Sequence, residues 1–112
     1  MTSPDGDGTV VARSEEIADG EMLGVHVDGR SIAIYRSEGR LYATGNICTH
    51  GQALLTDGWL EDGVIECPLH GGRFDIGSGA CLGPPVDEPL ATYPVSERDG
   101  EIRVSTRTEA RP

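Results

Sequence analysis

Residues 48–70 read CTHGQALLTDGWLEDGVIECPLH, and this stretch decides how the rest of the chain is interpreted. It contains a C-x-H pair at Cys48 and His50 and, after sixteen intervening residues, a C-x-x-H pair at Cys67 and His70. Each pair offers one thiolate and one imidazole, which suit soft metal ions. Glycine follows both pairs and allows tight loops that aim backbone N–H groups inward. The stretch therefore predicts one metal centre built from two loops.

Two kinds of metal centre use two cysteines and two histidines. A structural zinc ion usually pairs like ligands, C-x₂₋₄-C and then H-x₃₋₅-H. This chain interleaves the two ligand types. In an iron–sulfur centre of the Rieske type, two histidines replace two cysteines on one iron. The spacing favours the iron–sulfur centre and leaves structural zinc as the alternative.

The chain resembles Rieske iron–sulfur proteins in these motifs and over about residues 9–105. The resemblance implies one Rieske-type [2Fe–2S] cluster per chain, with Cys48 and Cys67 on the buried iron and His50 and His70 on the outer iron. It also implies a proline loop, Gly83-Pro84-Pro85, over the cluster. Further similar segments are Phe74-Asp75, Gly77-x-Gly79 and Leu90-x-x-Tyr93-Pro94-Val95. Backbone N–H donors to sulfur are expected from the family pattern at Gln52, Ala53, Leu69 and Gly72.

Short apolar segments between turn signals predict an all-β chain. Asp28-Gly29, Asp62-Gly63 and Asp99-Gly100 are typical of two-residue hairpins, and Glu38-Gly39 marks another turn. The expected strands are residues 9–12, 22–27, 31–36, 41–44, 64–66, 73–76, 91–95 and 101–104. The resemblance implies a single Rieske domain over residues 1–112, an antiparallel β-sandwich with a small cluster-binding subdomain at about residues 45–82.

The charge balance restricts the kinds of partner. Nineteen acidic and nine basic residues give a net charge of −10. This charge argues against nucleic acid and anionic membranes, and it favours protein partners with basic surfaces. The N-terminus has no signal-peptide pattern, and no apolar run is long enough to span a membrane. With two of three cysteines assigned as ligands, Cys81 has no partner for an internal disulfide, so we expect a cytoplasmic location.

Several residues outside the motifs are expected to have structural roles. Cys81 is interpreted as a small buried apolar residue, and Trp59 as an anchor in the core or the subdomain. His26 should be an exposed or hydrogen-bonded strand residue, because on a period of two it faces opposite Val25 and Val27. Asn46 and Gln52 are expected to serve as turn or hydrogen-bonding residues.

Differences from the high-potential Rieske proteins of respiratory complexes indicate the function. Those proteins have a loop disulfide where this chain has Ala53 and Leu69, and Ser and Tyr hydroxyl donors where it has Gly72 and Phe74. The resemblance therefore implies a soluble, low-potential one-electron carrier that is not itself an enzyme. It would pass electrons from a flavin-dependent reductase to a terminal ring-hydroxylating dioxygenase in aromatic hydrocarbon catabolism. The alternative function is the small Rieske subunit of an assimilatory nitrite reductase.

Overall fold

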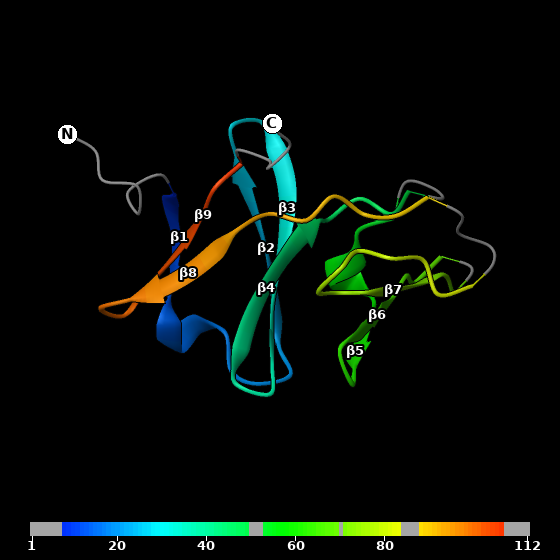
Figure 1. Cartoon of the computed structure of the whole chain (residues 1–112), viewed down its shortest axis with the longest axis horizontal. Helices are drawn as coiled ribbons and strands as arrows, with labels where there is room; N and C mark the ends of the chain where they lie inside the picture. Colours follow the sequence, from blue (N-terminus) through cyan, green and yellow to red (C-terminus); the bar gives the residue numbers. More distant parts are fainter. Residues whose placement is uncertain (1–7, 50–52, 70, 84–87, 107–112) are drawn as a thin grey trace.

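The computed structural model describes residues 8–49, 53–69, 71–83 and 88–106. Within these ranges the strands pair antiparallel into three-stranded sheets of order β1-β9-β8, β2-β3-β4 and β5-β6-β7 (Figure 1). The elements are β1 (Thr9–Arg13), η2 (Ser14–Glu16), β2 (Met22–Val27), β3 (Arg30–Ser37), β4 (Arg40–Gly45), η3 (Leu55–Asp57), β5 (Trp59–Glu61), β6 (Val64–Glu66), β7 (Arg73–Asp75), β8 (Val95–Arg98) and β9 (Glu101–Val104). We call β5-β6-β7 the small sheet.

Four of the turns between paired strands form where an X-Gly dipeptide lies in the sequence. Asp28, Glu38, Asp62 and Asp99 have φ between 52° and 54°, and the glycine that follows each has φ between 76° and 78°. Two successive residues with positive φ give the hairpin turn whose twist matches that of the flanking strands. The turns expected at these four positions are confirmed.

Strand β3 is buried on both faces and separates two apolar cores. Ile32 and Ile34 face the β1-β9-β8 sheet, and Ala33 and Tyr35 face the small sheet. In Figure 1 the β2-β3-β4 sheet accordingly lies between the other two. Burial of each isoleucine stabilises the fold by about 1.5–3 kcal/mol relative to exposure. The expected all-β architecture, an antiparallel sandwich with a smaller unit at one end, is confirmed.

The strand expected at residues 91–95 was wrong in position. Strand β8 begins at Val95, and Thr92 forms an isolated bridge with Thr44. Pro94 lies between them and has no N–H to donate to a ladder, which explains why regular pairing begins after it. Strand β5 at Trp59–Glu61 was not expected.

Within the described ranges, the chain has no helix that is long and apolar enough to cross a membrane.

Arg36 connects three parts of the sandwich. Its Nε donates to the carbonyl of Ile17 at 2.7 Å and its Nη2 to the carbonyl of Ser14 at 3.3 Å. Nη1 and Nη2 also donate to the two carboxylate oxygens of Glu97 on β8, at 3.2 and 2.8 Å. These hydrogen bonds are the main reason why the pKa of Glu97 falls from 4.5 to about 2.

We expect Glu97→Gln to lower the free energy of unfolding by about 0.5–1 kcal/mol at neutral pH, since the ion pair is partly exposed and screened by solvent. Because the folded-state pKa is depressed, the contribution is present above pH 4.5 and is lost as the pH falls towards 2. Urea unfolding of both proteins at about pH 7 and about pH 3 checks this. The prediction is contradicted if the free energies of unfolding of wild type and variant differ by as much at about pH 3 as at about pH 7.

Candidate metal centre

The first motif lies on a loop closed by two backbone hydrogen bonds. After β4, the N–H of Leu55 donates to the carbonyl of Asn46 at 2.7 Å, and the N–H of Cys48 donates to the carbonyl of Ala53 at 2.9 Å. The pairing continues the antiparallel pattern beyond the strand and folds the chain back on itself. Cys48 is thereby fixed at the base of the loop.

The side chain of Asn46 fixes this loop to the η3 turn. Its Oδ1 accepts the N–H of Thr56 at 2.9 Å, and its Nδ2 donates to Thr56 Oγ1 at 3.1 Å. Asn46 is almost fully buried, so these bonds satisfy polar atoms that have lost water. The expected hydrogen-bonding role of Asn46 is confirmed. Gln52 lies outside the described residues.

The second motif follows β6 in the same way. The N–H of Cys67 donates to the carbonyl of Gly72 at 2.7 Å, directly beyond the paired residues Glu66 and Arg73. Within the loop, Gly71 has a φ of 74°, a conformation that residues with a side chain rarely adopt. Cys67 therefore also lies at the base of a closed loop.

The thiols of Cys48 and Cys67 come together where the two loops begin. They are 2% and 0% exposed, neither is in a disulfide, and both belong to the apolar core that contains Phe74. The N–H of Leu69 donates to Cys67 Sγ at 3.4 Å, which confirms the donor expected at Leu69. The donors expected at Ala53 and Gly72 stay predictions.

The surroundings of Cys67 raise the pKa of its thiol. Burial contributes most, because an apolar environment disfavours the thiolate. The N–H of Leu69 acts in the opposite direction, and the adjacent Cys48 thiol raises the pKa further. A bound metal cation would stabilise both thiolates and displace their protons. Two reduced thiols held together, with a hydrogen-bond donor at one sulfur, therefore fit two thiolate ligands of one metal centre.

The other predicted parts of the site lie outside the described residues. These are His50, His70 and the Pro84-Pro85 part of the proline loop. Within the described ranges, His, Cys, Asp and Glu side chains form no group of three or more that could hold a metal ion. The structure therefore brings together the two predicted cysteines and does not place the two histidines.

Thr49 connects the first loop to the chain that follows the proline loop. Its hydroxyl donates to the carbonyl of Glu88 at 2.8 Å. On the other side, the N–H of Leu82 donates to the carbonyl of Arg73 at 2.9 Å. The two chain segments that flank residues 84–87 are thus bonded to the first loop and to the start of β7. Sequence analysis missed the role of Thr49, because its partner is 39 residues away and is a backbone atom without a sequence signal.

Two interpretations of single residues need correction. Trp59 was interpreted as an anchor in the core or the subdomain, but the residue is 60% exposed. The alternation along β5 explains this, since Leu60 faces the core and Trp59 faces away from it. Cys81 is only half-buried, at the edge of the core next to Phe74. His26 is exposed between less exposed neighbours, as expected.

Residues 7–94 match the family model described as the Rieske [2Fe–2S] domain. The chain belongs to this Rieske family. A ferredoxin component of the naphthalene 1,2-dioxygenase system of Pseudomonas aeruginosa is 54% identical over 80 residues, which cover 71% of this chain and 77% of that protein. The relatives are electron-transfer components of dioxygenase systems rather than the oxygenases, which confirms the prediction of a Rieske-type ferredoxin.

Solved Rieske structures agree with this assignment. A ferredoxin of Sphingomonas yanoikuyae B1 superimposes with a TM-score of 0.84 at 38% identity, over 89% of this chain and 99% of that one. A structure described as a complex of reduced oxygenase and oxidized ferredoxin in carbazole 1,9a-dioxygenase superimposes with a TM-score of 0.87 at 33% identity, over 94% of this chain and 98% of the matched chain.

The nitrite reductase alternative has weaker support. A structure described as a nitrite reductase small subunit superimposes with a TM-score of 0.76 but only 20% identity, over 86% of this chain and 95% of that one, which shows the fold alone. The family and the ferredoxin relatives carry the Rieske [2Fe–2S] cluster, so this cluster is the cofactor rather than a structural zinc ion. The buried thiol pair of Cys48 and Cys67 is compatible with that cofactor.

Proposed function

We propose that this chain is the low-potential ferredoxin of a ring-hydroxylating dioxygenase system acting on aromatic compounds. It accepts single electrons from a flavin-dependent reductase and passes them to the terminal oxygenase, in the cytoplasm. It consists of one Rieske domain over residues 1–112, in which residues 45–82 form the cluster-binding subdomain. The paired free thiols at the bases of two closed loops carry the proposal.

In this proposal four side chains hold the cluster. Cys48 and Cys67 hold the buried iron, and His50 and His70 hold the outer iron. When bound, the cluster supplies a one-electron redox couple. The residues of the chain keep the sulfurs away from water, since Cys48 and Cys67 lie in the apolar core. The Leu69 N–H at Cys67 Sγ would stabilise the more negative, reduced state.

The surface beside the loops supports contact with a protein partner. Exposed apolar side chains border both motifs: Ile47 next to Cys48, and Leu69 two residues after Cys67. Leu82, immediately before the proline loop, is also exposed. Apolar side chains grouped around a redox centre favour association, because a partner covers them and excludes water from the electron path.

Electron transfer to a terminal oxygenase tests the proposal. The chemically reduced protein, mixed with an oxidised terminal dioxygenase of the naphthalene type, should be reoxidised in a single-turnover reaction that also reduces the oxygenase. If the protein exchanges electrons with the flavoprotein of a nitrite reductase but does not reduce the dioxygenase, the alternative function is supported. Zinc with no acid-labile sulfide in the native protein would contradict both.

We expect a reduction potential near −150 mV, the lower end of the Rieske range. Hydrogen bonds to cluster sulfurs raise the potential, and Phe74 lacks the hydroxyl that the high-potential proteins have. Phe74 is fully buried in the same core as Cys48 and Cys67. Phe74→Tyr should therefore raise the potential by on the order of 50 mV, equal to about 1.2 kcal/mol at 59 mV per 1.4 kcal/mol.

Spectroscopic redox titration checks this prediction. Phe74→Leu is the matched control, because it changes the packing at the same position without adding a hydroxyl. The account is contradicted if the wild-type potential lies well above zero. It is also contradicted if Phe74→Tyr keeps the native spectrum and has the potential of Phe74→Leu.

A further inference from the structure

The outer face of the small sheet carries the only tryptophan of the chain. In the register of this sheet, Trp59 pairs with Glu66 and Glu66 with Arg73, so the three residues form one row across the strands. The row Leu60, Ile65 and Phe74 faces the core. Because side chains alternate along strands, the row of Trp59 faces outward.

Acidic side chains line a depression next to this tryptophan. A shallow depression of about 340 Å³ lies beside the indole. It is lined by Trp59, Glu61, Asp62, Val64, Glu66 and Arg73. Three carboxylates and one guanidinium therefore line the depression, which has a net negative charge.

The exposure of Trp59 is itself informative. The residue is 60% exposed, more than any other large apolar residue in the described part of the chain. Tryptophan has a large apolar surface and is usually mostly buried in monomeric proteins. At protein interfaces it is among the residues that contribute most to binding energy. A cation placed over an indole also gains from the negative face of the ring.

The acidic face extends to the second cluster loop. Glu66 immediately precedes Cys67, and its Oε2 lies 3.4 Å from the position of a Cβ built on Gly71. A partner that covers Trp59 and Glu66 would therefore also lie beside Gly71, close to Cys67.

We propose that Trp59, with the carboxylates of Glu61, Asp62 and Glu66, is the docking surface for a basic patch of the terminal oxygenase. An arginine or lysine of that partner stacks on the indole, and the three carboxylates pair with its neighbouring cations. The inference rests on the proposed function, since it names the surface used for that electron transfer. The oxygenase is chosen as the occupant because a similar ferredoxin was solved in complex with an oxygenase.

Calorimetric binding to the terminal oxygenase of a naphthalene 1,2-dioxygenase system tests the proposal with cluster-loaded protein. Trp59→Ala should raise the Kd about 30-fold, equal to about 2 kcal/mol at 1.4 kcal/mol per factor of ten. The visible spectrum and the reduction potential should not change, because Trp59 points away from the core. Trp59→Phe should raise the Kd less than Trp59→Ala, since a smaller ring remains for stacking.

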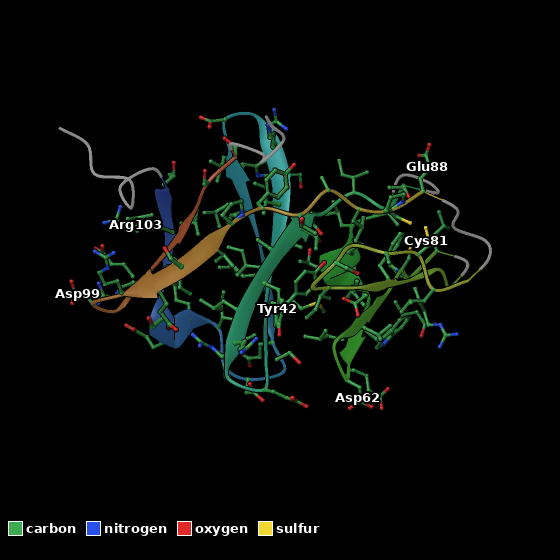
Figure 2. All side chains as sticks on the ribbon, in the orientation of Figure 1. Tyr42, Asp62, Cys81, Glu88, Asp99 and Arg103 are labelled. Carbon is green, nitrogen blue, oxygen red and sulfur yellow. The ribbon has the colours of Figure 1, made fainter. Side chains whose placement is uncertain are left out.

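A pair of matched variants tests the acidic side chains. Asp62 and Asp99 both begin Asp-Gly turns with a φ of 54°, and Figure 2 shows them far apart, with Asp99 at the left end of the molecule and Asp62 at the bottom. Asparagine accepts this conformation, so each variant removes one charge without straining the turn. Asp62→Asn should raise the Kd roughly two- to fivefold at low salt, and Asp99→Asn should leave it unchanged.

A rise in Kd of fivefold or more for Trp59→Ala, together with a larger rise for Asp62→Asn than for Asp99→Asn, supports the docking surface. A smaller rise in the Kd of Trp59→Ala overturns it, as do equal Kd values for Asp62→Asn and Asp99→Asn. Weaker binding to the reductase with unchanged binding to the oxygenase also overturns it. If Trp59→Ala loses the native spectrum, the Kd values of Asp62→Asn and Asp99→Asn alone decide whether this surface binds the oxygenase. Failure of the wild type itself to bind or reduce the oxygenase would instead refute the proposed function, and the docking surface with it.

Discussion

The Cys67→Ala protein should contain no [2Fe–2S] cluster. Cys67 is fully buried beside Cys48 in the apolar core, and alanine removes one of the two thiolates that would hold the buried iron. The apo protein should also be less stable, because metal binding contributes to folding when the ligands are assembled only in the folded state. Iron and acid-labile sulfide analysis, the visible spectrum, and EPR of the reduced protein measure the loss.

Cys81→Ala is the matched control for this prediction. Cys81 is the third free cysteine, it is half-buried next to Phe74, and it is not among the proposed ligands. This variant should keep the full iron content and the native EPR signal. A native signal in reduced Cys67→Ala, or loss of the cluster in a folded Cys81→Ala protein, would refute the ligand assignment.

Gly58→Ala should disrupt the cluster loops although Gly58 is not a ligand. A Cβ on Gly58 would overlap the carbonyl oxygen of Glu66 and lie 3.1 Å from Pro68 Cδ. The backbone of Glu66 and Pro68 flanks Cys67, so relief of the overlap must move this cysteine. The φ of −98° at Gly58 is not in the left-handed region, and the overlap with Glu66 is the reason for the expected effect.

We expect Gly58→Ala to lower the free energy of unfolding by about 3 kcal/mol, and the melting temperature by roughly 12–24 °C, with loss of bound iron. Gly45→Ala is the control, because a Cβ there would meet no atom within 4 Å. Thermal unfolding and iron content of the two variants check the prediction. Equal stability of Gly58→Ala and Gly45→Ala would mean that the close contact with Glu66 does not constrain the loop.

Short sequence patterns predicted those parts of the fold that depend on the backbone conformation of a few neighbouring residues. The four X-Gly dipeptides require positive φ at two successive residues, and this requirement identifies hairpins without tertiary information. The apolar segment of β3 was identified as a strand, but its burial on both faces arises from two sheets that pack against it. The pairing of Cys48 and Cys67 was predicted from ligand chemistry and family resemblance.

Errors occurred where long-range packing decides the outcome. The exposure of Trp59 depends on which face of β5 meets the core, and β5 itself was not recognised as a strand. Regular pairing of the last hairpin begins after Pro94, although the apolar residues begin earlier. The bond from Thr49 to the carbonyl of Glu88 depends on the path of distant chain segments, which no local pattern encodes.

Stopped-flow reduction of a terminal dioxygenase tests the central claim most directly. The reduced protein, mixed with the oxidised terminal oxygenase of a naphthalene 1,2-dioxygenase system, should transfer one electron per chain. The second-order rate should fall as salt rises, because a protein with a net charge of −10 would be steered to a basic surface. An oxygenase that stays oxidised in the presence of excess reduced, cluster-loaded protein would contradict the account.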